Sequence, residues 1–130
     1  MDTNSNRSGK FLHKEITQAI IGAAFEVHKH LGYGYLEKVY QRAMQVELLG
    51  RGLKAELEHA IQVHYKGVVV GDYAADLFVD ECVIVELKAG PEYCPSHEAQ
   101  LLNELVSTRV RVGLLINFGR ERVEFKRMAH

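Results

Sequence analysis

Apolar residues in the first third of the chain recur every three or four positions, which is the spacing of one face of an α-helix. The first such run contains Leu12, Ile16, Ala19, Ile20, Ala23, Val27 and Leu31. The second run contains Leu36, Val39, Tyr40, Ala43 and Val46. The first run is followed by Gly32 and Gly34 and the second by Gly50 and Gly52, and glycine commonly ends a helix. The chain is therefore expected to begin with two amphipathic helices.

After the second helix the pattern changes to the alternation and β-branched runs that are typical of strands. We expect strands over residues 53–58, 61–65, 68–79 (as one strand or two), 82–88, 110–118 and 123–126. Lys66-Gly67 and Asp80-Glu81 are expected to be turns. A third helix with Ser96 as its N-cap is expected before the last two strands. The predicted order is α-α-β-β-β-β-α-β-β, and the strands on either side of the third helix should form a parallel or mixed pair in an α/β sheet.

The composition fits one globular domain. The 130 residues are 47% hydrophobic and 25% charged, so the chain can bury one core without disulfides. Residues 1–9 are polar and are expected to form a flexible tail, which leaves residues 10–130 as a single domain. Cys82 and Cys94 are too few for a four-thiolate metal site and are interpreted as reduced thiols.

Nothing in the sequence points to secretion or to a membrane. The N-terminus lacks the apolar stretch of a signal peptide, and the longest apolar runs are too short to span a bilayer. We therefore expect a cytoplasmic protein without a membrane partner. The formal net charge of -1 excludes an obligate polybasic binder, yet basic residues gather toward the C-terminus. This candidate phosphate-contacting set consists of Arg109, Arg111, Arg120, Arg122, Lys126 and Arg127.

The most informative polar residues interrupt apolar strands. Glu86 and Lys88 are two positions apart on one strand and therefore share a face. Asp76 lies within the apolar run of the preceding strand. A two-residue turn between these strands would put Asp76 on the wrong face, whereas a three-residue loop or a bulge would pair Val79 with Val83 and Asp76 with Glu86. We predict the second arrangement.

Two carboxylates that face each other in this way can chelate one cation, and they suit Mg²⁺ or Mn²⁺. The alternative for Glu86 and Lys88 is a surface face with a salt bridge. Glu37, beside the apolar stripe of the second helix, is a further candidate; the alternative there is a first-turn glutamate favoured by the helix dipole. For Gln100, on the third helix, spacing alone favours a solvated face.

Short motifs along the chain resemble, in order and in spacing, those of the GxxExxY protein family. The signature matches Gly34-Tyr35-Leu36-Glu37-Lys38-Val39-Tyr40. Further matching segments are residues 65–67, 71–73, 75–77, 85–88, 97–102 and 113–119, so the resemblance covers roughly residues 11–128. That family is placed in the PD-(D/E)XK nuclease-like superfamily, which implies a mixed central sheet flanked by helices in the order α-β-β-β-α-β.

The resemblance also implies roles for single residues. Asp76 resembles the motif aspartate, Glu86 the motif acid and Lys88 the lysine that follows it. Glu37 resembles the helix glutamate that joins the metal site, and Gln100 resembles the glutamine of the following helix.

Two positions depart from the superfamily pattern. Glu104 stands where many relatives have a tyrosine, and Ala75 stands where the motif has a proline. Neither change removes a predicted metal ligand, but the first leaves the role of the third helix open.

The leading hypothesis is a metal-dependent nuclease that hydrolyses phosphodiester bonds of DNA or RNA. Asp76, Glu86 and Glu37 would hold one Mg²⁺ (or Mn²⁺) with the backbone carbonyl of Leu87. Lys88 and Gln100 would then act on the attacking water and on the phosphate.

Three further hypotheses accompany the leading one. A non-catalytic module that binds nucleic acid or protein is the main alternative. A small-molecule phosphodiesterase would use the same residues. A homodimer would suit a small nuclease that must reach both strands.

Overall fold

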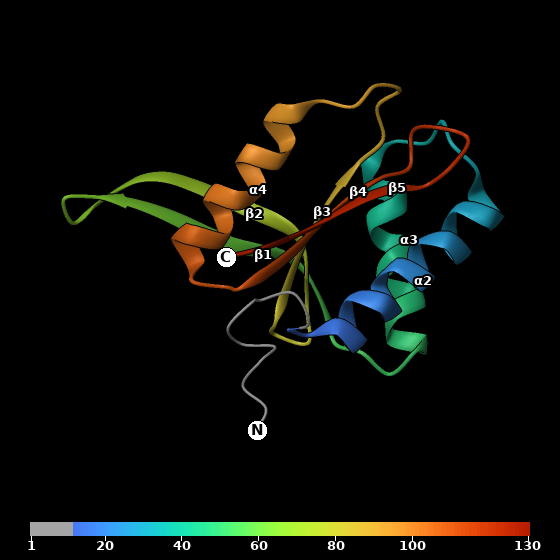
Figure 1. The fold of residues 1–130 in the computed structure, drawn as a ribbon, viewed down its shortest axis with the longest axis horizontal. Helices are drawn as coiled ribbons and strands as arrows, with labels where there is room; N and C mark the ends of the chain where they lie inside the picture. Colours follow the sequence, from blue (N-terminus) through green and yellow to red (C-terminus); the bar gives the residue numbers. More distant parts are fainter. Residues whose placement is uncertain (1–11) are drawn as a thin grey trace.

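A computed structural model describes residues 12–130 as a mixed sheet with helices on both faces (Figure 1). The predicted flexible tail, residues 1–9, lies outside the described residues. The helices are α2 (Lys14–Leu31), α3 (Glu37–Gly50) and α4 (Pro95–Thr108). The strands are β1 (Ala55–Tyr65), β2 (Val68–Val79), β3 (Val83–Lys88), β4 (Val112–Asn117) and β5 (Glu124–Ala129). They lie in the order β1-β2-β3-β4-β5, with only β3 and β4 parallel, which confirms the predicted α/β fold.

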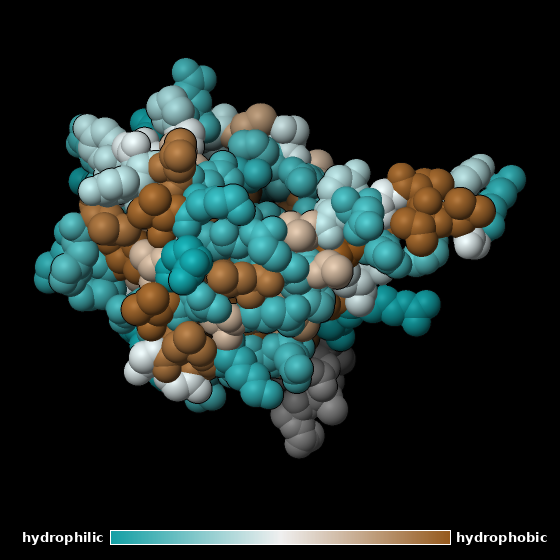
Figure 2. All heavy atoms as spheres, turned by 180° about the vertical axis from the view of Figure 1, so that it is seen from behind, coloured by the Kyte–Doolittle hydropathy of each residue, from teal (hydrophilic) through white to brown (hydrophobic). Residues whose placement is uncertain are grey.

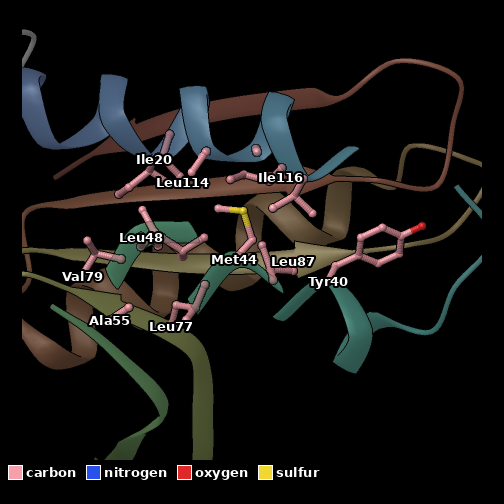
Figure 3. Packing of buried hydrophobic residues seen from close by; sticks show 14 of the residues in the cluster. Ile20, Tyr40, Met44, Leu48, Ala55, Leu77, Val79, Leu87, Leu114 and Ile116 are labelled. Atoms are coloured by element: carbon pink, nitrogen blue, oxygen red, sulfur yellow. The ribbon is translucent and has the colours of Figure 1, made fainter. Parts of the chain in front are cut away.

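Helices α2 and α3 pack side by side on one face of the sheet and build the larger core (Figure 3). The predicted apolar stripe of the first helix faces inward, because it is too hydrophobic to remain in water. The stripe predicted for the second helix is wrong in part: Leu36, Val39 and Val46 are exposed, and α3 buries Tyr40, Met44 and Leu48 instead. The fully buried side chains here include Ile20, Tyr40, Met44, Leu48, Leu77, Val79, Leu114 and Ile116. This core holds β2, β3 and β4 rigidly, and β2 and β3 carry the predicted site.

Tyr40 anchors the loop between α2 and α3. Its buried ring stacks on Phe118, with the ring centroids 4.6 Å apart. Its hydroxyl donates a hydrogen bond to the Gly32 carbonyl over 2.7 Å and accepts one from the Tyr35 N–H over 3.3 Å. Gly32 ends α2 with a left-handed φ of 71°, which a residue with a side chain rarely adopts. Tyr40 therefore fixes the start of α3, including Glu37, against the end of β4.

Helix α4 covers the opposite face of the sheet (Figure 1). Its buried residues Leu101 and Leu105 pack there against β3 and β4. The predicted N-cap at Ser96 is wrong, because the helix begins at Pro95 with Cys94 as its N-cap. Proline favours the first helical position since it has a fixed φ and no N–H to leave unpaired.

The predicted break within β1 is wrong, because β1 is one strand; β2, predicted as one strand or two, is one strand. The two strands pair from Ala55–Val79 to Tyr65–Val68 around the predicted turn at Lys66-Gly67, with a gap in the pairing at Glu58 and Asp76 and a shift in register after Val63. Backbone hydrogen bonds hold the two strands together even where the side chains do not alternate regularly. Three strands, not four, therefore separate α3 from α4.

The outer half of the β1–β2 hairpin extends beyond the rest of the sheet (Figures 1 and 2). Its tip is apolar and exposed, as the brown patch at the end of the projection in Figure 2 shows. The exposed side chains there are Tyr65, Val68, Val69 and Val70.

Two predictions about the whole chain can be compared with the described part of it. No helix within residues 12–130 has both the length and the apolar composition needed to cross a membrane. Cys82 and Cys94 are both free thiols.

Gly119 allows β3 and β4 to end close together. A Cβ atom at this position would lie 2.1 Å from the Gly90 carbonyl oxygen and 2.6 Å from the Ala89 carbonyl carbon. Both are backbone atoms, so no rotamer change relieves the clash. The Phe118 N–H also donates to the Lys88 carbonyl oxygen over 2.8 Å, which links the same two segments.

We expect Gly119→Ala to lower the free energy of unfolding by about 1–3 kcal/mol, because overpacking forces the backbone to move. Urea denaturation measures this difference. Gly90→Ala is the control, because nothing lies within 4 Å of its added Cβ atom. Equal effects of the two substitutions would contradict this explanation.

Candidate active site

The loop between β2 and β3 sets the register of the site. Val79 pairs with Val83, which confirms the prediction of a three-residue loop. Asp80 and Glu81 in this loop have left-handed φ angles of 51° and 56°. The Asp80 carboxylate accepts a hydrogen bond from the Lys54 N–H over 2.8 Å and so fixes the turn.

Strand β2 leaves its neighbours at Asp76. Its pairing with β3 ends at Leu77–Val85, and its pairing with β1 skips Asp76 and Glu58. The Leu87 N–H of β3 instead donates to Asp76 Oδ2 over 2.7 Å. The Asp76 side chain thus accepts a hydrogen bond that the backbone of a neighbouring strand would otherwise accept, and the backbone pairing of β2 with β3 stops at this residue. We call this position the Asp76 break.

Gln41 of α3 binds the backbone of β2 at the Asp76 break. Its buried amide donates to the Asp76 carbonyl oxygen over 2.9 Å and also to the Glu58 carboxylate. Glu58 has a left-handed φ of 56°, so β1 also leaves regular strand geometry here. Glu37 precedes Gln41 by one helical turn and therefore lies on the same side of α3. Its side chain is exposed.

Glu86 and Glu104 form a buried carboxyl pair between β3 and α4. Their side chains are 7% and 6% exposed, and Glu86 Oε2 and Glu104 Oε1 have no hydrogen-bond partner among residues 12–130. Burial, reinforced by the neighbouring Glu104 and Asp76 carboxyls, raises the pKa of Glu86 to about 10. Burial also raises the pKa of Glu104. At neutral pH the pair therefore holds a proton unless a cation takes its place.

Lys88 ends β3 and lies beside a cleft of about 220 Å³ on one side of α4. His97, Asn117 and Lys126 also line this cleft. The ion pairs seen among residues 12–130 join other side chains, so Lys88 is not held by a carboxylate there. Burial, and then the charge of Lys88, lowers the pKa of His97.

Gln100 lies on the other side of α4, beside a larger cleft of about 610 Å³ that Glu104 also lines. Its amide donates to Glu104 Oε2 over a long 3.5 Å. Gln100 is thus next to the Glu86–Glu104 pair but exposed to solvent.

The basic residues near the C-terminus do not form one surface. Those before β4 are Arg109 and Arg111. Those at the other end of β4, where Asn117 pairs with Lys88, are Arg120, Arg122 and Lys126. Arg127 faces α2, where its guanidinium donates to the Leu12 carbonyl over 2.6 Å and where burial lowers its pKa. Lys126 of this second group lines the same cleft as Lys88, and Arg120 and Arg122 follow the strand end at which Asn117 pairs with Lys88.

The donor atoms at the Asp76 break suit a hard divalent cation. Carboxylate and carbonyl oxygens are the preferred ligands of Mg²⁺, and one buried oxygen each of the neighbouring Glu86 and Glu104 accepts no hydrogen bond from the described N–H and O–H donors. Within residues 12–130, however, no three Asp, Glu, His or Cys side chains are already arranged to hold an ion. Asp76 Oδ2 accepts a hydrogen bond from the Leu87 N–H, which leaves Oδ1 for a cation, and the exposed Glu37 would have to turn toward it on binding.

Comparison with known proteins identifies the family of the chain. The model of the PD-(D/E)XK nuclease superfamily matches residues 14–128. The chain belongs to this superfamily, as its sequence motifs predicted; the closer resemblance to the GxxExxY family stays a prediction. No curated protein sequence gives a significant match.

A solved structure supports the same fold. The crystal structure of SSO0001 superposes with a TM-score of 0.52 and 16% sequence identity. The alignment covers 95% of this chain but 61% of that one, so the chain spans less than two thirds of the other protein. At this identity the likeness concerns the fold alone.

Sequence reasoning did not identify every residue at the Asp76 break. Gln41 and Glu58 were not among the candidates, and Glu104 was noted only as a departure from the superfamily pattern. Gln41 carried a usable signal, because it lies one helical turn after Glu37. Glu58 carried no usable signal in the sequence, because its left-handed φ lies within a strand whose alternation of apolar and polar residues is irregular.

Proposed function

We propose that this protein is a metal-dependent nuclease that hydrolyses phosphodiester bonds of DNA or RNA. The observation that carries the proposal is the Asp76 break. There, the Asp76 carboxylate binds the backbone of β3 between Glu86 and Lys88, in a chain that belongs to a nuclease superfamily. A carboxylate pair and a lysine that no ion pair within residues 12–130 neutralises are groups that phosphodiester hydrolysis can use.

In this proposal Asp76 and Glu86 hold one Mg²⁺ or Mn²⁺, and Glu37 and the Leu87 carbonyl are further ligands. The bound cation supplies a Lewis acid and a water of lowered pKa. Lys88 orients the attacking water and stabilises the charge that develops on the phosphate. Gln100 positions water or phosphate from the side of α4.

Arg120, Arg122 and Lys126 are the residues we propose to contact the nucleic-acid backbone, because they lie at the Lys88 end of the sheet. Such contacts supply affinity without reading sequence. Arg109 and Arg111 lie at the other end of β4, about five strand residues away, or roughly 17 Å.

The proposal is tested first by thermal melting in EDTA, Mg²⁺ and Mn²⁺, and then by cleavage of labelled single-stranded, duplex and branched DNA and of RNA. A cation at a hundredfold excess over its Kd is expected to stabilise the protein by about 2.7 kcal/mol. The isosteric double variant Asp76→Asn/Glu86→Gln should lose both this stabilisation and cleavage. Equal melting of both proteins, together with no cleavage of any substrate, would contradict the proposal.

One observation favours a second candidate, a non-catalytic binding module. The net charge is -1 and the basic residues are dispersed, whereas a nuclease acting alone usually presents a stronger basic surface. A module of this kind would retain nucleic acid in a gel-shift assay, with or without the cation, and would leave it uncut.

A further inference from the structure

We infer that Glu104 is an additional carboxylate ligand of a divalent cation, which it holds with Glu86 between β3 and α4. The inference deepens the proposed function, because it rests on the proposed cation site, but it does not depend on cleavage. It gives α4 a direct part in cation binding.

Geometry is the first support. Glu104 projects from α4 and Glu86 from β3, and both are more than nine-tenths buried. Each carboxylate has one oxygen without a hydrogen-bond partner in the described part of the chain, Oε1 of Glu104 and Oε2 of Glu86. Buried polar atoms are nearly always paired in folded proteins, so two orphaned oxygens on facing elements indicate a missing ligand.

Charge is the second support. Two carboxyl groups buried side by side repel each other when both are ionised. No lysine or arginine forms an ion pair with either of them among residues 12–130. A hydrogen bond between the two carboxyl groups needs one of them to carry a proton, whereas a divalent cation can accept electron pairs from several ionised oxygens at once.

Access is the third support. Glu104 lines the cleft of about 610 Å³ that lies between α4 and the β1–β2 hairpin. The cleft is large enough for a hydrated cation to enter from solvent. Gln100 contacts Oε2 of Glu104 and not Oε1, so Oε1 is buried behind the cleft without competition from the Gln100 amide.

The test is a calorimetric titration of the full chain with Mn²⁺ alone, in the absence of nucleic acid. Glu104→Gln keeps the shape of the side chain and removes a buried charge, so the variant should fold. We expect it to bind Mn²⁺ at least about tenfold more weakly than the unaltered protein. Glu104→Asp keeps a carboxylate and should recover part of the affinity. Glu98→Gln is the matched control, because it removes one negative charge from the same helix.

The outcomes separate this inference from the proposed function. If Glu86→Gln weakens Mn²⁺ binding and Glu104→Gln does not, the role of Glu104 is wrong while the proposed site remains. An equal loss in Glu104→Gln and Glu98→Gln would also overturn it, because the effect would then be one of net charge. If neither Glu86→Gln nor Glu104→Gln changes the affinity, or if the unaltered protein binds no Mn²⁺, the inference and the proposed site both fail. Melting in EDTA verifies that each variant is folded.

Discussion

Lys88→Ala is expected to lower kcat for phosphodiester cleavage by about 10²–10⁴-fold, the range that one positioned proton-transfer or charge-stabilising group contributes. Lys88 lies at the end of β3, beside a cleft and without a carboxylate partner among residues 12–130. Its ammonium is therefore available to water and to phosphate. Because Lys88 is not a proposed cation ligand, the rise in Tm that Mn²⁺ causes should persist in the variant.

The matched control for Lys88 is Lys126→Ala, which removes the same charge from the same cleft. Lys126 is proposed to contact the nucleic-acid backbone only, so its loss should raise KM and leave kcat nearly unchanged. Lys88→Met keeps the aliphatic stem and separates the loss of the charge from a loss of packing. If Lys88→Ala cleaves at a rate close to that of the unaltered protein, the role assigned to Lys88 is wrong.

In EDTA, the free energy of unfolding is expected to fall as the pH rises from 5 to 8, and Glu86→Gln should remove most of this fall. Burial raises the pKa of Glu86 to about 10, so the folded protein keeps a proton that the unfolded chain loses near the ordinary value of 4.5. Between these two values the unfolded state binds fewer protons than the folded state. Stability therefore declines with rising pH, by about 1.4 kcal/mol per pH unit for one group.

Over the interval from pH 5 to pH 8 this linkage amounts to about 4 kcal/mol for Glu86. Urea denaturation at the two pH values measures the difference, and Glu86→Gln should be clearly more stable than the unaltered protein at pH 8. Glu81→Gln, at an exposed position in the β2–β3 loop, is the control for the loss of one negative charge. The same pH dependence in Glu86→Gln and in the unaltered protein would mean that Glu86 is ionised in the folded state.

The elements of the fold could be predicted because they depend on local patterns. Helical spacing of apolar residues defined α2 and α3, and an apolar strand on each side of a helix indicated the parallel pair β3 and β4. The register at Val79–Val83 followed from one argument, that Asp76 and Glu86 must share a face. The boundaries that were wrong, at Ser96 and within β1, depend on capping and on pairing with a distant strand, which a local pattern does not contain.

The sequence by itself determined the superfamily and the residues that form its motifs. Only the tertiary structure decided how these residues meet. Burial of Glu86 against Glu104 requires α4 to lie across β3, and the opening of the sheet at Asp76 requires Gln41 of α3 to hold the backbone of β2. The separation of the basic residues to opposite ends of β4 is likewise a result of strand direction. These features depend on contacts between residues far apart in the chain, and burial and electrostatic coupling exist only once such contacts have formed.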